Sequence, residues 1–429
     1  MTRIALLPSE PLRARMAGIG LRYLELARRL PRPGLEVVVL TPGEPAEVPV
    51  LPGGTPSCGA QVRRFERGRL AELVADCDAA VAQGQLANDL LLECRALPVA
   101  IDLYDPWLIE NLHYRETLGL DPYRNDHATW VLQMSRGDFF LCSSEEQRCF
   151  YLGFLAALGR LNPRRIEMDP TLDGLIAPVP FGVPDELPPH QPVLPERRDG
   201  GRRLLFGGLY DWYDPFTLLE ALARLEALPW TLLLVENPNP ASTPQRRFAE
   251  VRAWCEARGW WGSPTSPARV ESIPWVPFER RYDLLRDVDA LVATHRPSIE
   301  SDLALRTRFL DAFAAGCPAV ASDGGTVARL MRDAGAGWVA PPGDPEALAA
   351  CLAEVLAGGE AVEAKRRAGL GLARRFAWET VLAPLVAWCR APGADPTKEE
   401  FAFRPPTVAP PDRLSFRLRR RLGGWMGAG

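Results

Sequence analysis

Long hydrophobic runs are missing from this sequence of 429 residues, so we expect no membrane-spanning helix, which needs about 18 consecutive apolar residues or more. Histidine is scarce, with four residues, and the nine cysteines form no CxxC pair. Cys142 and Cys149 are the closest pair, and their spacing fits neither a zinc site nor a redox motif. We therefore expect reduced, mostly buried thiols in a cytoplasmic protein.

An excess of positive charge is also absent, because the formal net charge is −4. This balance argues against a protein that binds nucleic acid through bulk charge. The sequence opens on a strand pattern at residues 4–7 with no long apolar segment behind it, so a signal peptide is not expected. What the chain does have is a 47 % share of apolar residues and a length that favours two domains.

Short apolar strands alternate with helical patterns from end to end. The rhythm predicts parallel, doubly wound sheets of the α/β class. The predicted strands of the first half are residues 4–7, 37–40, 79–83, 99–103, 139–143 and 176–180. Those of the second half are residues 203–208, 231–235, 290–294, 319–322 and 337–340.

A segment rich in proline at residues 187–201 interrupts this alternation of strands and helices and is predicted to be a linker. We expect a first Rossmann-like domain at residues 1–190 and a second at residues 200–375. Residues 376–429 would form a helix that crosses back, followed by a tail. Two such domains would face a cleft, which is a common place for a small-molecule site.

The most informative segment runs from Arg306 to a glycine loop that ends at Gly325. Arg306 and Arg308 stand at a helix start, where unpaired N–H groups and the helix dipole favour an anion. Both arginines can bind phosphate oxygens in a bidentate fork. Asp311, one turn further, can accept hydrogen bonds from a ribose. The pattern predicts a nucleoside-diphosphate site without a metal; an ordinary amphipathic helix with surface arginines is the alternative.

Two glycine loops follow predicted strands and open helices. Gly18 and Gly20 lie in the first half, and Gly207 and Gly208 in the second, where the main chain can approach a phosphate or a sugar. A tight turn is the alternative for the first loop. Asp211 is free to meet substrate hydroxyls. Asp214 precedes a proline and is expected to cap a helix.

Acidic residues follow a strand of the first domain. Asp102 and Asp105 can each bond an acceptor hydroxyl or take its proton, although Asp105 can also cap a helix. Glu110, on that helix, belongs to a pattern that usually means a solvated polar face. In the second domain, Glu300 is expected where a sugar attached to the diphosphate would lie, and Trp275 can flank a nucleobase or pack in the core or at an interface.

The last segment differs in composition. Residues 403–411 are rich in proline and predicted to be extended. Residues 413–422 combine leucines at helical spacing with arginines, which predicts either peripheral contact with an anionic membrane surface or a helix packed on the first domain.

Taken together, these motifs resemble the retaining GT-B glycosyltransferases, close to glycosyltransferase family 4 and to a branch seen in bacterial polysaccharide and O-antigen synthesis. The resemblance covers roughly residues 1–390. It depends on the Gly-Gly-x-x-Asp-Trp-x-Asp-Pro loop at 207–215, the Arg-Thr-Arg helix at 306–308, and the segments 102–106, 142–163 and 180–184.

The resemblance implies transfer of a sugar, with retention, from a nucleotide sugar such as a UDP- or GDP-sugar to a glycan, lipid-linked or small-molecule acceptor. It implies no metal cofactor. The family's usual Arg and Lys in the second glycine loop are replaced by Leu209 and Asp214, and its first glutamate falls on Leu303. The catalytic-region histidine of the family corresponds to Asp102.

Two alternatives stay open. One keeps the fold but changes the reaction, as in a nucleotide-sugar epimerase or a pseudo-glycosyltransferase that couples a cyclitol. The other is a catalytically inactive partner protein with the same fold.

Overall fold

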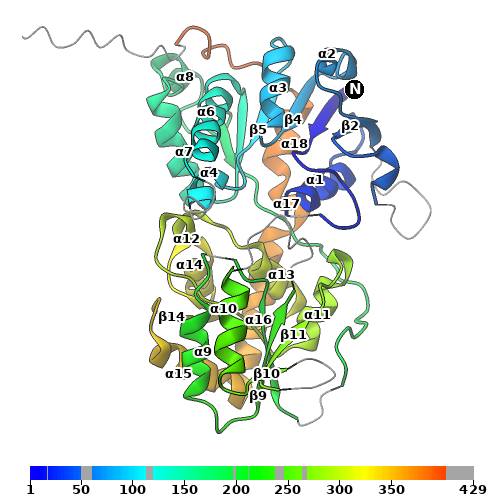
Figure 1. Ribbon diagram of the computed structural model, residues 1–429. Helices are drawn as coiled ribbons and strands as arrows, with labels where there is room; N and C mark the ends of the chain where they lie inside the picture. The colour runs from blue at the N-terminus through cyan, green and yellow to red at the C-terminus, as the bar shows by residue number, and fades with distance from the viewer. Residues whose placement is uncertain are drawn as a thin grey trace, which may run out of the picture.

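The computed structural model of the chain describes residues 1–16, 18–49, 60–112, 119–196, 200–210, 212–236, 246–262 and 268–401. Within them, two sheets of seven strands each lie one above the other, in separate domains (Figure 1). Every pair of neighbouring strands in these sheets is parallel. The predicted α/β class with two doubly wound parallel sheets is thus confirmed.

The first sheet has the order β3-β2-β1-β4-β5-β6-β7. Its strands are β1 (Thr2–Leu7), β2 (Leu35–Thr41), β3 (Gln61–Arg64), β4 (Ala79–Ala82), β5 (Val99–Asp102), β6 (Phe139–Cys142) and β7 (Ile176–Pro178). The helices of this half are α1 (Gly18–Arg29), α2 (Leu70–Leu73), α3 (Leu86–Glu93), α4 (Trp107–Asn111), α6 (Asp121–Arg136), α7 (Glu145–Ala157) and α8 (Pro163–Met168), with a 3-10 turn η1 (Pro45–Glu47).

The second sheet has the order β10-β11-β9-β8-β12-β13-β14. Its strands are β8 (Arg202–Gly207), β9 (Trp230–Val235), β10 (Trp261–Gly262), β11 (Val270–Ile273), β12 (Ala290–Ala293), β13 (Ala319–Ser322) and β14 (Gly337–Ala340). The helices that follow β8 are α9 (Pro215–Ala223), α10 (Arg246–Glu256), α11 (Arg281–Asp287), α12 (Ile299–Leu303), α13 (Thr307–Ala315), α14 (Gly325–Ala334), α15 (Pro345–Ala357), α16 (Glu360–Ala373), α17 (Trp378–Val381) and α18 (Ala383–Arg390), with 3-10 turns η3 (Phe278–Arg280) and η4 (Arg374–Phe376).

The inner strands are apolar at nearly every position because helices cover both faces of a parallel sheet. All residues of β12 and β13 are buried. β3 and β10 lie at sheet edges and outside the predicted strand series. The reason is visible in β3, whose polar sequence Gln-Val-Arg-Arg has no fully buried residue.

Each sheet has a point where the strand order reverses. β1 lies between β2 and β4, and β8 lies between β9 and β12. In open α/β sheets, ligands bind outside the carboxyl ends of the strands at such switch points. The second switch point therefore brings the residues that follow β8 and β12 to one place.

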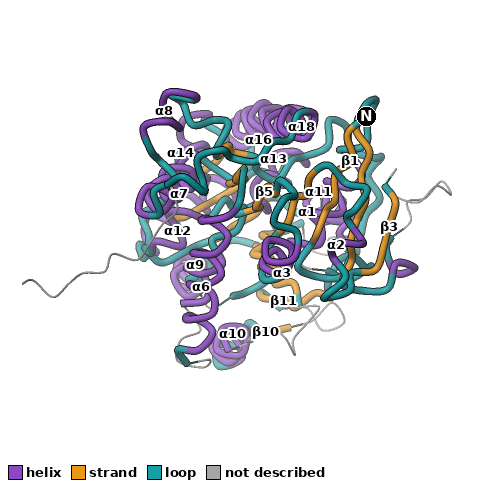
Figure 2. The backbone as a smooth tube through the Cα atoms, turned by 90° about the horizontal axis from the view of Figure 1, so that it is seen from above, coloured by secondary structure: helices purple, strands orange, loops and turns teal. Residues whose placement is uncertain are grey.

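The C-terminal helices cross from the second domain back to the first. Figures 1 and 2 show α16 and α18 in line along one side of the molecule. Trp378 and Leu385 belong to the same apolar core as Tyr23 of α1. A Cβ at Gly182 would lie 2.4 Å from the Trp378 ring, so this crossing requires glycine there.

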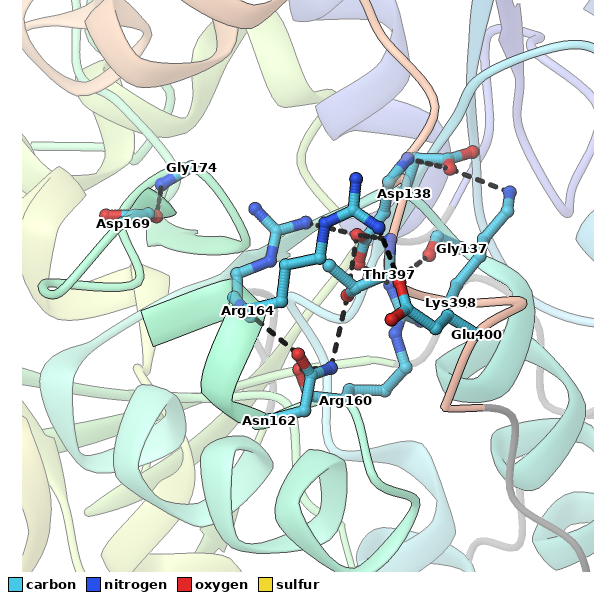
Figure 3. Close-up of polar contacts among 12 residues, drawn as sticks. Gly137, Asp138, Arg160, Asn162, Arg164, Asp169, Gly174, Thr397, Lys398 and Glu400 are labelled. Carbon is cyan, nitrogen blue, oxygen red and sulfur yellow. Dashed lines mark hydrogen bonds and ion pairs between the residues drawn. The ribbon is translucent and has the colours of Figure 1, made fainter. Parts of the chain in front are cut away.

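The segment after α18 is tied to the first domain by polar contacts. Arg160 Nη2 donates to Asp395 Oδ2 at 2.7 Å, and Asn162 Nδ2 donates to Thr397 Oγ1 at 3.2 Å. Figure 3 shows Arg160 and Asn162 turned toward this segment. The Gly-Arg-Leu-Asn-Pro motif at 159–163 thus anchors the chain that follows the crossing helices.

The linker is held against the second domain. Asp287 accepts hydrogen bonds from the backbone N–H groups of Val193 and Leu194 at 2.7 and 2.9 Å. Asp289 accepts from the backbone N–H of Arg203 at 2.7 Å. The Asp-Val-Asp sequence at 287–289 thus has a structural role, in holding the linker and the first residues of β8.

Residues 402–429 lie outside the described part of the chain, and so do the predicted extended segment and the predicted basic helix of the tail. Among the helices that the structure describes, none has the length and apolar character needed to cross a membrane.

Candidate functional site

The two arginines predicted to bind phosphate lie at the start of α13, on either side of the residue that begins it. Arg306 is the N-cap residue of α13, and Arg308 lies in its first turn. Their guanidinium carbons are 5.4 and 4.7 Å from the centre of the Tyr213 ring, which follows β8. The aromatic ring thus holds two positive charges beside the switch point of the second sheet.

Arg308 reaches the glycine loop that follows β8. Its Nη1 donates to the carbonyl oxygens of Phe206 at 3.0 Å and Gly208 at 3.5 Å. Gly207 has φ +83°, and a Cβ there would lie 3.1 Å from that nitrogen. In the described part of the chain, no carboxylate forms an ion pair with Arg308. This loop therefore needs glycine, and no acid among the described residues neutralises the charge of Arg308.

Arg306 has an acidic partner. Its Nη2 donates to Glu300 Oε2 at 2.8 Å, and the Glu300 side chain is 1 % exposed. Glu300 belongs to α12, which begins at a cap made by the Ser298 hydroxyl. Leu303, on which the resemblance places the family's first glutamate, is buried, whereas Asp302 is exposed. Of the acids near that position, Glu300 is the one that holds Arg306.

Two further carboxyl groups face this pair from the first domain. α4 packs against α12 across the domain boundary. Burial raises the pKa of Glu110 well above its usual value, and Asp105 and Glu300 raise it further. Burial likewise raises the pKa of Asp105, which shares a side-chain hydrogen bond with Glu110. Three acids and one arginine therefore meet here, which favours a bound proton on the Asp105–Glu110 pair.

Asp102 is placed differently from its neighbours. Arg22 Nε and Nη2 donate to its two carboxylate oxygens at 2.7 and 3.2 Å, and both residues are 1 % exposed. The backbone N–H of Tyr104 also donates to it. The predicted role of Asp102 in positioning an acceptor hydroxyl stays untested, but this geometry favours a structural role.

Asp311 lies on α13 and faces Arg281 of α11. Its Oδ2 is 3.1 Å from Arg281 Nε, while its Oδ1 is buried and has no hydrogen-bond partner among the described residues. Trp275 is partly exposed in the loop after β11, and Arg15 of the first domain lies 5.9 Å above its ring. Asp311 thus keeps one carboxylate oxygen without a partner among the described residues, and the Trp275 ring lies where a side chain of the first domain meets the second.

The first glycine loop is less open than the second. The backbone N–H of Gly20 already donates to the Glu10 carboxylate, so the start of α1 is capped by a side chain. Gly18 is exposed, with open space where a Cβ would stand. Asp211 lies outside the described residues, and its predicted role stays a prediction. Asp214 accepts from the N–H of Thr217 and is the N-cap of α9, as expected.

Side chains of α7 join the two domains beside the site. Gln147 donates from Nε2 to the carbonyl oxygen of Leu303 at 3.0 Å and is fully buried. Glu146 accepts from Thr326 Oγ1 at 2.7 Å and from Arg329 Nε at 3.0 Å. These contacts fix α12 and α14 relative to the first domain.

His295 is a residue of this site that the sequence analysis does not single out. It follows β12, its ring centre is 4.9 Å from that of Tyr213, and its side chain lines a small pocket with Arg306. Burial, and then the charges of Arg306 and Arg308, hold its pKa well below the usual value. Its position one residue beyond the predicted strand 290–294 is the one signal in the sequence that points to it.

Comparison with known proteins gives a family match for the second domain. Residues 202–358, which contain the arginines, the glycine loop and His295, match the profile of a family described as glycosyl transferases group 1. A search of curated proteins finds no relative of this chain by sequence.

Solved structures with similar folds cover almost the whole chain. Sucrose-phosphate synthase (tll1590) from Thermosynechococcus elongatus has a TM-score of 0.62 and 15 % identity, over 91 % of this chain and 98 % of that one. Alr3699/HepE of Anabaena, in complex with UDP-glucose, has a TM-score of 0.59 and 16 % identity, over 90 % and 98 %. WaaG, a glycosyltransferase involved in lipopolysaccharide biosynthesis, has a TM-score of 0.57 and 16 % identity, over 91 % and 100 %. The predicted GT-B fold is thus confirmed.

Proposed function

With residues 202–358 as a glycosyltransferase group 1 domain within a GT-B fold, we propose that the chain moves a sugar from a nucleoside diphosphate sugar to an acceptor hydroxyl. The observation that carries this proposal is Arg308, a cation without an acidic partner among the described residues, aimed at the glycine loop after β8. Such a group at a switch point suits a pyrophosphate.

The chemistry follows from where charge develops. As the anomeric bond breaks, negative charge grows on the oxygens of the departing nucleoside diphosphate. Arg306 and Arg308 are already in place beside the loop at Gly207, so they stabilise that charge without reorganising. We propose that no metal ion is needed, because the two guanidinium groups supply the charge. The tie between Arg306 and Glu300 keeps the first guanidinium in position.

The remaining parts of the donor can be assigned from free atoms near the boundary. The Oδ1 of Asp311, which has no partner among the described residues, is proposed to accept from a ribose hydroxyl, and Trp275 is proposed to flank the base. On the acceptor side, Asp105 and Glu110 are the acids that face the site from the first domain. Retention of anomeric configuration, by attack on the same face as the leaving group, belongs to this proposal.

A screen of UDP- and GDP-sugars tests the proposal. We expect one of these sugar nucleotides to raise the melting temperature of the protein in the presence of EDTA. With that donor and a panel of glycan, lipid-linked and small-molecule acceptors, the product anomer is read by NMR from its one-bond coupling. Inversion would contradict the proposed mechanism. A rearranged free sugar without acceptor would indicate an epimerase, and no binding at all would favour a catalytically inactive partner.

A further inference from the structure

His295 leaves one buried polar atom without a partner. Its side chain is 6 % exposed, and its Nε2 has no hydrogen-bond partner among the described residues. The backbone is held firmly, because the N–H of His295 donates to Ser322 Oγ at 3.1 Å and the Thr294 carbonyl accepts from the N–H of Asp214 at 2.9 Å. A buried polar group without a partner destabilises a protein, so the ring is positioned at a cost that a ligand can offset.

The pocket that His295 lines has a mixed character. Its polar residues come from the ends of β12 and β13, from α12, and from the starts of α13 and α14: His295, Ser301, Arg306, Ser322, Asp323 and Gly324. Apolar side chains, among them Phe309 and Val327, make up the rest of its lining. α14 begins next to it at Gly325, where N–H groups point outward from the helix.

The chemistry of this pocket suits a hydroxyl group. The ring of His295 is neutral at physiological pH because burial and the nearby arginines lower its pKa. A neutral imidazole nitrogen is a donor in one tautomer and an acceptor in the other, and a hydroxyl can pair with either. Ser301 and Ser322 add further hydroxyl groups. A phosphate would instead favour the charged guanidinium groups of Arg306 and Arg308.

We propose that this pocket is a subsite for a hydroxyl group of the transferred sugar, and that His295 Nε2 is the atom that binds it. The inference depends on the proposed function, since Arg306 lines the pocket and would hold the phosphate to which the sugar is attached. His295 would help to determine which sugar is transferred, because a sugar without that hydroxyl would leave Nε2 without a hydrogen-bond partner.

The test compares affinities for the nucleoside diphosphate and for its sugar conjugate. His295→Phe keeps a ring but removes the nitrogen, and His295→Gln restores a polar atom at similar reach. We expect His295→Phe to lower the affinity for the sugar nucleotide about five- to tenfold, which corresponds to the loss of one hydrogen bond. The affinity for the nucleoside diphosphate should not change. His295→Gln should recover part of the loss. His190→Phe, at an exposed histidine paired with Asp287, is the matched control and should change neither affinity.

Deoxy analogues of the donor identify the hydroxyl. Removing the contacted hydroxyl should weaken binding to the wild-type protein as much as His295→Phe does, and the two losses should not add. If His295→Phe lost the same affinity for the nucleoside diphosphate as for its sugar conjugate, the proposed subsite would be wrong. A change in melting temperature without any change in affinity would do the same, because it would mean that Nε2 binds only a water. A wild-type protein that binds no nucleotide would overturn the proposed function itself.

Discussion

The Asp102→Asn variant separates a catalytic role from a structural one at the end of β5. Asparagine keeps the size of the side chain but removes the charge that pairs with Arg22. The two hydrogen bonds between these residues, 2.7 and 3.2 Å long, are both buried, so the guanidinium group would be left as an uncompensated charge. Breaking such a buried pair costs about 3–5 kcal/mol.

For a domain of this size, that loss should lower the melting temperature by about 6–20 °C. Scanning calorimetry at pH 7 measures it. Arg22→Met combined with Asp102→Leu should recover most of the stability, because the double variant removes both charges together with Arg22 Nη1, which is buried without a partner among the described residues. Glu256→Gln, in an exposed helical pair, should shift the melting temperature very little.

The reasoning would be refuted by Asp102→Asn protein that melts like the wild type yet has lost activity. That result would support a catalytic role for Asp102, as the sequence resemblance implies. Loss of stability with activity retained below the melting temperature would support the structural role.

Two other changes probe the second glycine loop and the acidic cluster. Gly207→Ala should lower stability by about 1–2 kcal/mol and weaken nucleoside-diphosphate binding, because the residue has positive φ and its Cβ would press on Arg308. Gly335 also has positive φ, but a Cβ there would meet open space, so Gly335→Ala should be less stable in calorimetry and bind the nucleoside diphosphate like the wild type. Equal affinity of the Gly207→Ala and Gly335→Ala variants would contradict the proposed contact between residue 207 and Arg308. Glu110→Gln should raise the melting temperature at pH 8, because the raised pKa of Glu110 means that its ionised form is disfavoured in the folded state. The gain should vanish as the pH falls below the unfolded-state pKa of about 4.3, where glutamic acid is protonated in both states; a pH series of melting curves without that trend would rule out the acidic cluster.

The fold was predictable because its signals are local. The strands at 319–322 and 337–340 match β13 and β14 residue for residue, since short apolar runs bounded by turns mark buried parallel strands. β3 carries no such local signal, because an edge strand needs no apolar face and its pairing with β2 depends on residues distant in sequence.

The candidate site was predictable only in part. Arg306 and Arg308 stood out because two arginines at a helix start with a glycine loop nearby form a local pattern. Arg22 and Glu110 did not, because a charged residue on a helix is ordinarily solvated. Their burial arises from Asp102 and from α12, which meet them only in the folded chain.

The most direct test of the account is a calorimetric titration of the preferred nucleoside diphosphate in EDTA, with wild-type protein, Arg308→Ala and Arg252→Ala. Arg252 lies in an exposed pair on α10 and serves as the matched control. We predict binding without metal, unchanged affinity for Arg252→Ala, and a loss of about 1.5–3 kcal/mol for Arg308→Ala, roughly a 10- to 150-fold weaker affinity. Equal affinity of folded Arg308→Ala and wild type, or binding that appears only with added divalent metal, would contradict it.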